Sequence, residues 1–216
     1  MKRSLGLWKR PYAGVNHLIV GLGNWYYPLS RESVGLYALE RYAQRYSLVW
    51  DFIPNICSDA LASKTGIALI KPKTYQQKDM GKAVAMATEA MNLTIDDVTI
   101  LHYDANLPCG QVRYRTGALD APNVAVQSII NMFDTERLNR VSIGIKPVSE
   151  DEVFVPTIVQ AIDKRYLDNF NDIWIRNVLS DTERPLVDKA SDKVTDELLH
   201  SATNTTDNTF SRLNTL

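Results

Sequence analysis

The sequence predicts a single α/β domain in which a mixed β-sheet is flanked by helices. Short apolar runs alternate with amphipathic stretches over residues 17–145, and this order is typical of strands that are connected by helices. The first apolar run ends in a Gly-x-Gly-Asn turn that leads into a helical stretch. The 216 residues, of which 45% are apolar, can bury one sizeable core and fit one domain better than two.

The first predicted strand, residues 17–22, is the element around which the rest is organised. Its loop contains Gly21 and Gly23, which permit close backbone approaches that a Cβ would forbid, and ends at Asn24. A helix is predicted from Val34, with apolar residues at the spacing of one buried face. Because open α/β sheets bind ligands beyond the carboxyl ends of their strands, we expect the functional site at this loop.

Each later element is predicted from a short apolar run or a helical repeat. In chain order these are an edge strand near 50–53, a strand at 67–71, a helix at 79–91, strands at 98–102 and 111–115, a helix at 123–133 and a strand at 141–145. Helices are also expected from about 153, at 165–179 and at 182–200, with Thr182 as the N-cap of the last.

The predicted organisation has four parts. Residues 1–16 form a basic N-terminal extension, 17–180 the domain, 181–200 a C-terminal helix and 201–216 a flexible tail.

The composition excludes several classes of function. The net charge of −1 gives no global basic field, so any RNA contact must come from a local patch. Cys57 and Cys109 lack the spacing of metal ligands, and we expect neither a metal nor a cofactor. No apolar run approaches the roughly 20 residues of a membrane span.

The first residues suggest a compartment. Lys2, Arg3, Lys9 and Arg10 precede the first acidic residue, Glu32, and an acid-free basic start is typical of mitochondrial leaders. We therefore expect a mitochondrial protein, with the cytoplasm as the alternative.

Five short blocks carry a resemblance to a known family. They are Val20-Gly-Leu-Gly-Asn24, Ser30-Arg-x-x-Val-Gly35, Lys71-Pro-x-Thr-Tyr75 with Gly81-Lys-Ala-Val84, Leu107-Pro-x-Gly110 and Ile143-Gly-Ile-x-Pro147. Over roughly residues 17–180 the chain resembles the bacterial-type peptidyl-tRNA hydrolases. The resemblance implies cleavage of the ester between a peptide and the 3′-terminal ribose of tRNA. It implies a His general base, a carboxylate that orients this His, and Asn amides that hold substrate and oxyanion.

The residues that would carry this chemistry are only partly present. Asn24 matches the first Asn of the family, but Glu32 stands at the position of the His and Tyr103 at that of its carboxylate. The second substrate-binding Asn is replaced by Val124, unless Asn123 takes its role from one position earlier.

Other matching positions indicate contacts with the substrate or RNA. Tyr75 is retained and Gln77 keeps an amide where the family has Asn, while Arg113 and Arg115 match the basic positions of the tRNA-binding strand. Arg140 and four lysines extend this set to one basic side of a cleft; an ordinary solvated face is the alternative. These lysines are Lys71, Lys73, Lys78 and Lys82. Tyr26, Tyr27 and Tyr103 are expected either to stack on bases or simply to pack.

The pattern of losses predicts a peptidyl-tRNA hydrolase fold without hydrolysis. Glu has an ordinary pKa near 4.3 and is a poor general base at neutral pH unless it is desolvated. Glu32 has no partner that the sequence identifies, because Asp104 follows Tyr103 on a strand and faces the other way.

Three functions stay open. The first is a non-catalytic component that binds tRNA, rRNA or a ribonucleoprotein, such as a mitochondrial ribosome or an RNA-processing complex. The second is an active hydrolase with a rearranged site around Glu32, and the third is a scaffold that binds only proteins.

Overall fold

A seven-stranded mixed sheet forms the centre of the computed structural model, which describes residues 12, 14–62, 66–117, 123–148, 175 and 177–200. The strands are β1 (His17–Gly21), β2 (Asp51–Ile53), β3 (Ser58–Ala62), β4 (Ile67–Pro72), β5 (Val98–Pro108), β6 (Val112–Thr116) and β7 (Asn139–Lys146). The helices are α1 (Val34–Arg45), α2 (Met80–Met91), α3 (Val124–Phe133) and α5 (Arg184–His200), with short 3₁₀ turns η2 (Arg31–Ser33), η3 (Pro54–Ile56), η4 (Gln77–Asp79) and η5 (Ile95–Asp97).

The strand order is β2-β3-β4-β1-β5-β7-β6. β1 pairs in parallel with β4 and β5, and β5 pairs in parallel with β7, whereas β2, β3 and β6 join antiparallel. The carboxyl ends of β1, β4 and β5 therefore meet at one edge of the sheet. Asn24 and Gln77 lie in the loops that leave this edge.

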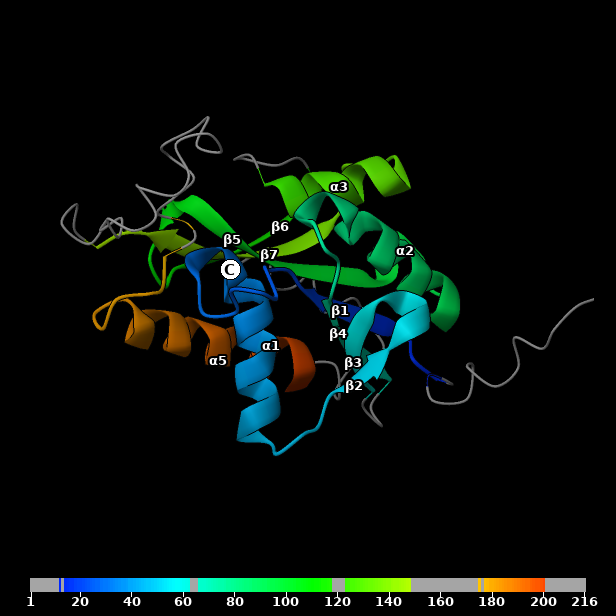
Figure 1. Ribbon diagram of the computed structural model, residues 1–216, viewed down its shortest axis with the longest axis horizontal. Helices are drawn as coiled ribbons and strands as arrows, with labels where there is room; N and C mark the ends of the chain where they lie inside the picture. Colours follow the sequence, from blue (N-terminus) through cyan, green and yellow to red (C-terminus); the bar gives the residue numbers. More distant parts are fainter. Residues whose placement is uncertain are drawn as a thin grey trace, which may run out of the picture.

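Helices cover both faces of the sheet, with α2 and α3 on one side and α1 and α5 on the other (Figure 1). The central strand β1 is buried between them and contributes to two cores. Leu18 and Val20 pack with residues of α2 and α3, whereas Ile19 packs with Leu39 of α1 and Val194 of α5. Because both faces of this strand are buried, its sequence is a continuous apolar run and not an alternating one.

Gly35 lets α1 begin directly against β5. A Cβ at this position would lie 2.2 Å from the carbonyl oxygen of Leu101, so a larger residue would push the helix away from the strand. Because η2 immediately precedes α1, this close approach also holds Glu32 beside β5.

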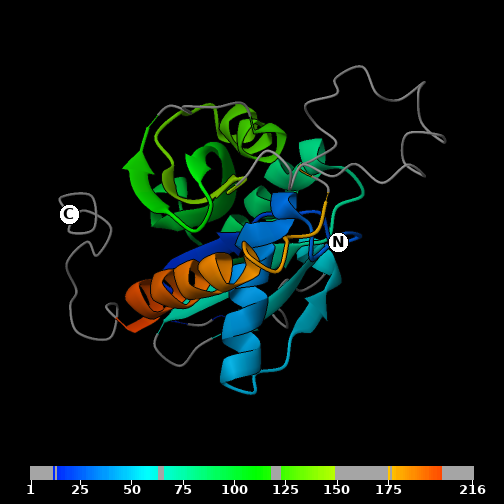
Figure 2. The ribbon, with the colours of Figure 1, turned by 90° about the vertical axis from the view of Figure 1, so that its left-hand side faces the viewer.

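The last described helix, α5, lies across α1 on the outside of the molecule (Figure 2). Polar contacts join the two helices at steps of four residues along each. The pairs in order are Tyr37 with Asp188, Arg41 with Asp192, and Arg45 with Asp196. None of the helices in the described part of the chain has the length and apolar composition needed to cross a bilayer.

The predicted α/β fold with a mixed sheet is confirmed, and the elements differ in three details. β3 was not predicted, and β5 continues to Pro108 instead of ending at His102. Ser180, and not Thr182, exchanges capping hydrogen bonds with Glu183 at the start of α5. The helices expected from about 153 and at most of 165–179 lie outside the described residues, as do the proposed tail and nearly all of the N-terminal extension.

Candidate functional site

Glu32 lies at the centre of the site and receives two side-chain amides from different loops. Asn24 Nδ2 donates to Glu32 Oε1 at 2.9 Å, and Gln77 Nε2 donates to Glu32 Oε2 at 2.7 Å. The residue is 7% exposed. The sequence identified no partner for Glu32, whereas the structure shows that its carboxylate accepts one amide from the loop after β1 and one from the loop after β4.

Ser33 fixes the loop that carries Asn24. Its hydroxyl accepts the backbone N–H of Asn24 at 2.9 Å and lies within hydrogen-bond distance of the carbonyl oxygens of Asn24 and Tyr27. The side-chain oxygen of Asn24 accepts the N–H of Tyr26 at 3.1 Å. This bond leaves the Nδ2 group of Asn24 directed at Glu32.

A buried ion pair connects the site to α5. Arg31, the neighbour of Glu32, pairs with Glu183, and both side chains are almost fully buried. Arg31 also donates to the carbonyl oxygen of Val178 at 3.0 Å, and Glu183 accepts the N–H of Ser180 at 2.9 Å. The turn η2 is thus anchored to the segment that begins α5.

On β5, Tyr103 occupies the position at which the family resemblance expects a carboxylate. Its carbonyl oxygen is 3.5 Å from Asn123 Nδ2. Asp104 follows on a regularly paired stretch, since the register shift between β5 and β7 comes only after it. Its carboxylate accepts the N–H of Asn106 and lies 3.7 Å from Arg113, so it is engaged toward β6.

The two histidine side chains that the structure describes lie away from Glu32. His102 is buried within the sheet, with Nδ1 2.7 Å from the carbonyl oxygen of Tyr103 and Nε2 3.1 Å from the hydroxyl of Ser142. Burial lowers the pKa of His102 to about 4. His17 contacts Thr99 at the start of β1, the end of the strand opposite to the site, and burial lowers its pKa as well.

A pocket of about 310 Å³, lined mostly by residues with polar side chains, lies between η4 and the start of α3. It is lined by Lys78, Asn123, Val124, Gln127, Ser128 and Asn131. Asn123 is the N-cap of α3, where its side-chain oxygen accepts the N–H of Val126, whereas Val124 is 58% exposed. The predicted pair Asn123 and Val124 therefore borders a pocket next to Gln77, with the carbonyl group of Asn123 used in the cap.

The predicted basic side of the cleft is divided into separate groups. Arg113 and Arg115 lie on the edge strand β6, with Arg115 exposed and Arg113 half-buried. Arg140 of β7 is buried, with a hydrogen bond to the carbonyl oxygen of Gly117, and is not part of an exposed patch.

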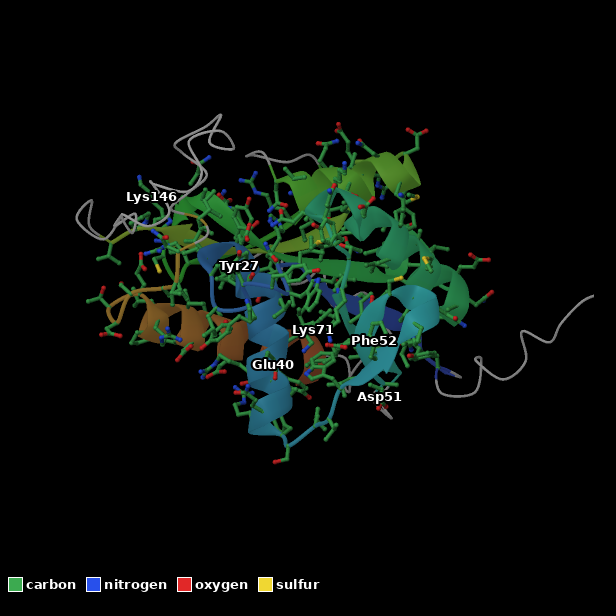
Figure 3. The ribbon with its side chains drawn as sticks, in the orientation of Figure 1. Tyr27, Glu40, Asp51, Phe52, Lys71 and Lys146 are labelled. Carbon is green, nitrogen blue, oxygen red and sulfur yellow. The ribbon has the colours of Figure 1, made fainter. Side chains whose placement is uncertain are left out.

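The lysines of β4 and its following loop belong to another cavity, of about 460 Å³, between α1 and β3. Lys71 is buried there, 2.6 Å from Glu40 and 3.7 Å from Asp59, and Figure 3 shows it facing Glu40 across the gap between strand and helix. Lys73 pairs with Asp59 at 2.9 Å. Lys71 and Lys73 thus form an ion-pair network with two carboxylates and not a positive surface.

Three tyrosines lie exposed around the site. Tyr26 and Tyr27 belong to the loop after Asn24, and Tyr75 to the loop before Gln77. Trp25 connects the loop after β1 to the loop after β4, because its indole N–H donates to the carbonyl oxygen of Thr74 at 3.1 Å.

Asn24, Glu32 and Gln77 are recognisable in the sequence, but their hydrogen bonds to one another and the supports from Ser33 and Glu183 are not. The signal present in the sequence was the pairing of substitutions: a carboxylate replaces the His while an amide is kept at position 77. Within the described residues, no group of three His, Cys, Asp or Glu side chains is arranged to hold a metal ion.

Comparison with known proteins gives a consistent result. The sequence profile of the family described as "Peptidyl-tRNA hydrolase" matches residues 18–215. The peptidyl-tRNA hydrolase of Geobacillus kaustophilus is 33% identical over 132 residues, which are 59% of this chain and 70% of the relative. That of Rickettsia typhi is 29% identical over 142 residues, 63% of this chain and 76% of the relative. The crystal structure of the Acinetobacter baumannii enzyme superposes with a TM-score of 0.67 at 20% identity, covering 88% of this chain and 94% of that one, and so matches its fold.

Proposed function

The chain belongs to the peptidyl-tRNA hydrolase family, and from this we propose that it binds the acceptor end of tRNA, or a similar RNA end, without hydrolysing the ester. The partner that we propose is a mitochondrial ribosome or an RNA-processing complex, which co-sedimentation of the chain with mitochondrial ribosomes would test.

The observation that carries the proposal is the occupation of the site by its own side chains. Asn24 and Gln77 stand at the positions where the family resemblance implies amides for the substrate, yet each donates one of its two N–H groups to Glu32. A substrate that took these two N–H groups would have to break their hydrogen bonds to a buried carboxylate. Hydrolysis would also need a base with an orienting partner, whereas the carboxylate of Asp104 is directed at β6.

The RNA contact that we propose is on the edge strand β6. Arg113 and Arg115 are two residues apart on this strand and project from the same face. Arginines spaced in this way suit successive phosphates of a nucleic acid backbone. Because such contacts release counterions, binding should weaken steeply with salt.

Hydrolysis and binding are tested on the same substrate. Peptidyl-tRNA is mixed with an excess of protein and ester cleavage is followed in a single turnover, with an active peptidyl-tRNA hydrolase as the positive control. We expect no cleavage above the protein-free background, together with retention of the substrate on the protein. Cleavage that Glu32→Gln abolishes would instead establish an active hydrolase with Glu32 as its base.

The binding is assigned by charge variants. Arg113→Gln and Arg115→Gln should each weaken tRNA binding and lower the slope of log K against log salt by about one. Absence of any RNA affinity at low salt would favour a scaffold that binds only proteins.

A further inference from the structure

We propose that Trp25, Tyr26 and Tyr75 form a stacking platform for unpaired nucleotides, which leads an RNA end toward Glu32. This inference rests on the proposed function, because it names the part of the RNA that the site receives. We call these three residues, with the adjacent Tyr27, the aromatic strip.

The aromatic strip comes from the same two loops that supply the amides of the site. The loop after β1 carries Asn24 and then Trp25 and Tyr26, and the loop after β4 carries Tyr75 and then Gln77. In both loops the amide is directed inward to Glu32. The tyrosines of the two loops are exposed instead, and Tyr26 of one loop contacts Tyr75 of the other.

The exposure of these rings is unusual for their size. Tyr26, Tyr27 and Tyr75 are 50%, 59% and 79% exposed. Large apolar surface gathered at one place on a protein commonly marks an interaction site, because its hydration is unfavourable. The cluster therefore indicates a partner that offers flat apolar surface.

The rings are held in position before any partner binds. Trp25 is fixed by its bond to Thr74, and its ring centroid is 3.9 Å from that of Tyr26. Tyr26 and Tyr75 meet edge to face, with centroids 6.2 Å apart at 84°. Preorganised rings lose little conformational entropy when a base stacks on them.

The surroundings of the aromatic strip favour a nucleic acid over an apolar protein segment. The cation that the loop after β4 offers is the exposed Lys78, which follows Gln77 and lines the pocket at the start of α3, whereas Lys73, near the ring of Trp25, is already paired with Asp59. That pocket also presents Gln127 and Asn131, which share one hydrogen bond with each other and whose remaining amide groups suit base edges and ribose hydroxyls. Aromatic faces beside cations are the combination with which proteins bind single-stranded nucleic acid.

The test compares two RNAs that differ only in their unpaired end. One is an acceptor-stem hairpin with four unpaired 3′ nucleotides, and the other is the same hairpin with a blunt end; the free tetranucleotide of the unpaired end is measured in parallel. Both carry a fluorescent label in the loop, and affinities are measured by anisotropy. We expect the unpaired end to strengthen binding at least tenfold, since each stacked base contributes substantially.

Variants assign this difference to the aromatic strip. Tyr26→Ala and Tyr75→Ala should each weaken binding of the unpaired end about tenfold and leave the blunt hairpin unaffected. The matched control is Tyr46→Ala, an exposed tyrosine of similar accessibility at the far end of α1. Circular dichroism and the melting temperature verify that each variant is folded.

The outcomes separate this inference from the proposed function. Equal affinity for both hairpins, unchanged in the tyrosine variants, would overturn the platform while RNA binding through β6 stands. Binding of the single-stranded tetranucleotide alone, without affinity for either hairpin, would uphold the platform and contradict tRNA-end recognition. No affinity for any of these RNAs would overturn both the platform and the proposed RNA binding, and would favour a protein partner.

Discussion

At the scale of single residues, the site depends on the hydroxyl of Ser33. This side chain is fully buried and is the partner of the backbone N–H of Asn24. Replacement by Ala would leave that N–H and nearby carbonyl groups without this partner, at a cost of about 1–3 kcal/mol.

We therefore expect Ser33→Ala to lower the free energy of unfolding by this amount in urea titrations. The control is Gln44→Ala, at an exposed helical position of α1 where the change should stay within about 0.5 kcal/mol. Equal stabilities of Ser33→Ala and the wild type would mean that the loop relaxes or that water replaces the hydroxyl.

The sequence identified the residues of the site better than it identified their contacts. Glu32 and Gln77 stand out because they fall on functional positions of a recognisable pattern, but they are 45 residues apart in the chain. Their hydrogen bond depends on how β1 and β4 align in the sheet, which no local pattern reveals. Arg140 illustrates the opposite error, since a basic residue on a strand was expected at the surface and is buried.

At the scale of elements, the attachment of α5 combines one buried ion pair with several partly exposed ones. Arg31 and Glu183 are desolvated, and removal of one partner from such a pair usually costs about 3–5 kcal/mol because a buried charge is left uncompensated. The pairs of Arg41 and Arg45 with Asp188, Asp192 and Asp196 remain partly exposed, and such pairs contribute about 1 kcal/mol or less.

Glu183→Gln should therefore destabilise the fold several times more than Asp188→Asn, a matched neutralisation on the same helix. Urea titrations of both variants measure the difference, and high salt should reduce only the contribution of Asp188. Similar losses of unfolding free energy in Glu183→Gln and Asp188→Asn would show that Arg31 finds another hydrogen-bond acceptor.

Most elements were predictable because each has a strong local period. β3 was not, because Ser58–Ala62 is a short run with two polar residues, and it becomes a strand by pairing with β2 and β4. The cap of α5 was misassigned since Ser180 and Thr182 are both suitable, and the reciprocal bond from Glu183 decides between them.

At the scale of the whole molecule, burial of His102 ties stability to pH. Its pKa is about 4 in the folded protein and near the ordinary 6.5 in the unfolded chain. Between these values the unfolded chain binds a proton that the folded protein does not, so stability falls as the pH is lowered. The contribution is present above pH 6.5 and is lost as the pH falls to about 4.

Unfolding measured at pH 7 and pH 4.5 should reveal this contribution. The wild type is expected to lose about 2–3 kcal/mol more than His102→Asn between the two values. The same pair of measurements on His17→Asn tests the second buried histidine. Because burial lowers the pKa of His17 as well, this variant should also lose less stability than the wild type between pH 7 and pH 4.5. If wild type and His102→Asn lost stability equally, His102 would be accessible to protons in the folded state.

The bond between Arg31 and Glu183 also determines when, during synthesis of the chain on the ribosome, the site around Glu32 can become fully structured. The two residues are 152 positions apart, so a ribosome releases Asn24, Glu32 and Gln77 long before the anchor of η2 exists. Contacts of such sequence separation close late in folding. Until the start of α5 emerges, the loop around Glu32 lacks its support, and any RNA that the protein binds there must await the last part of the fold.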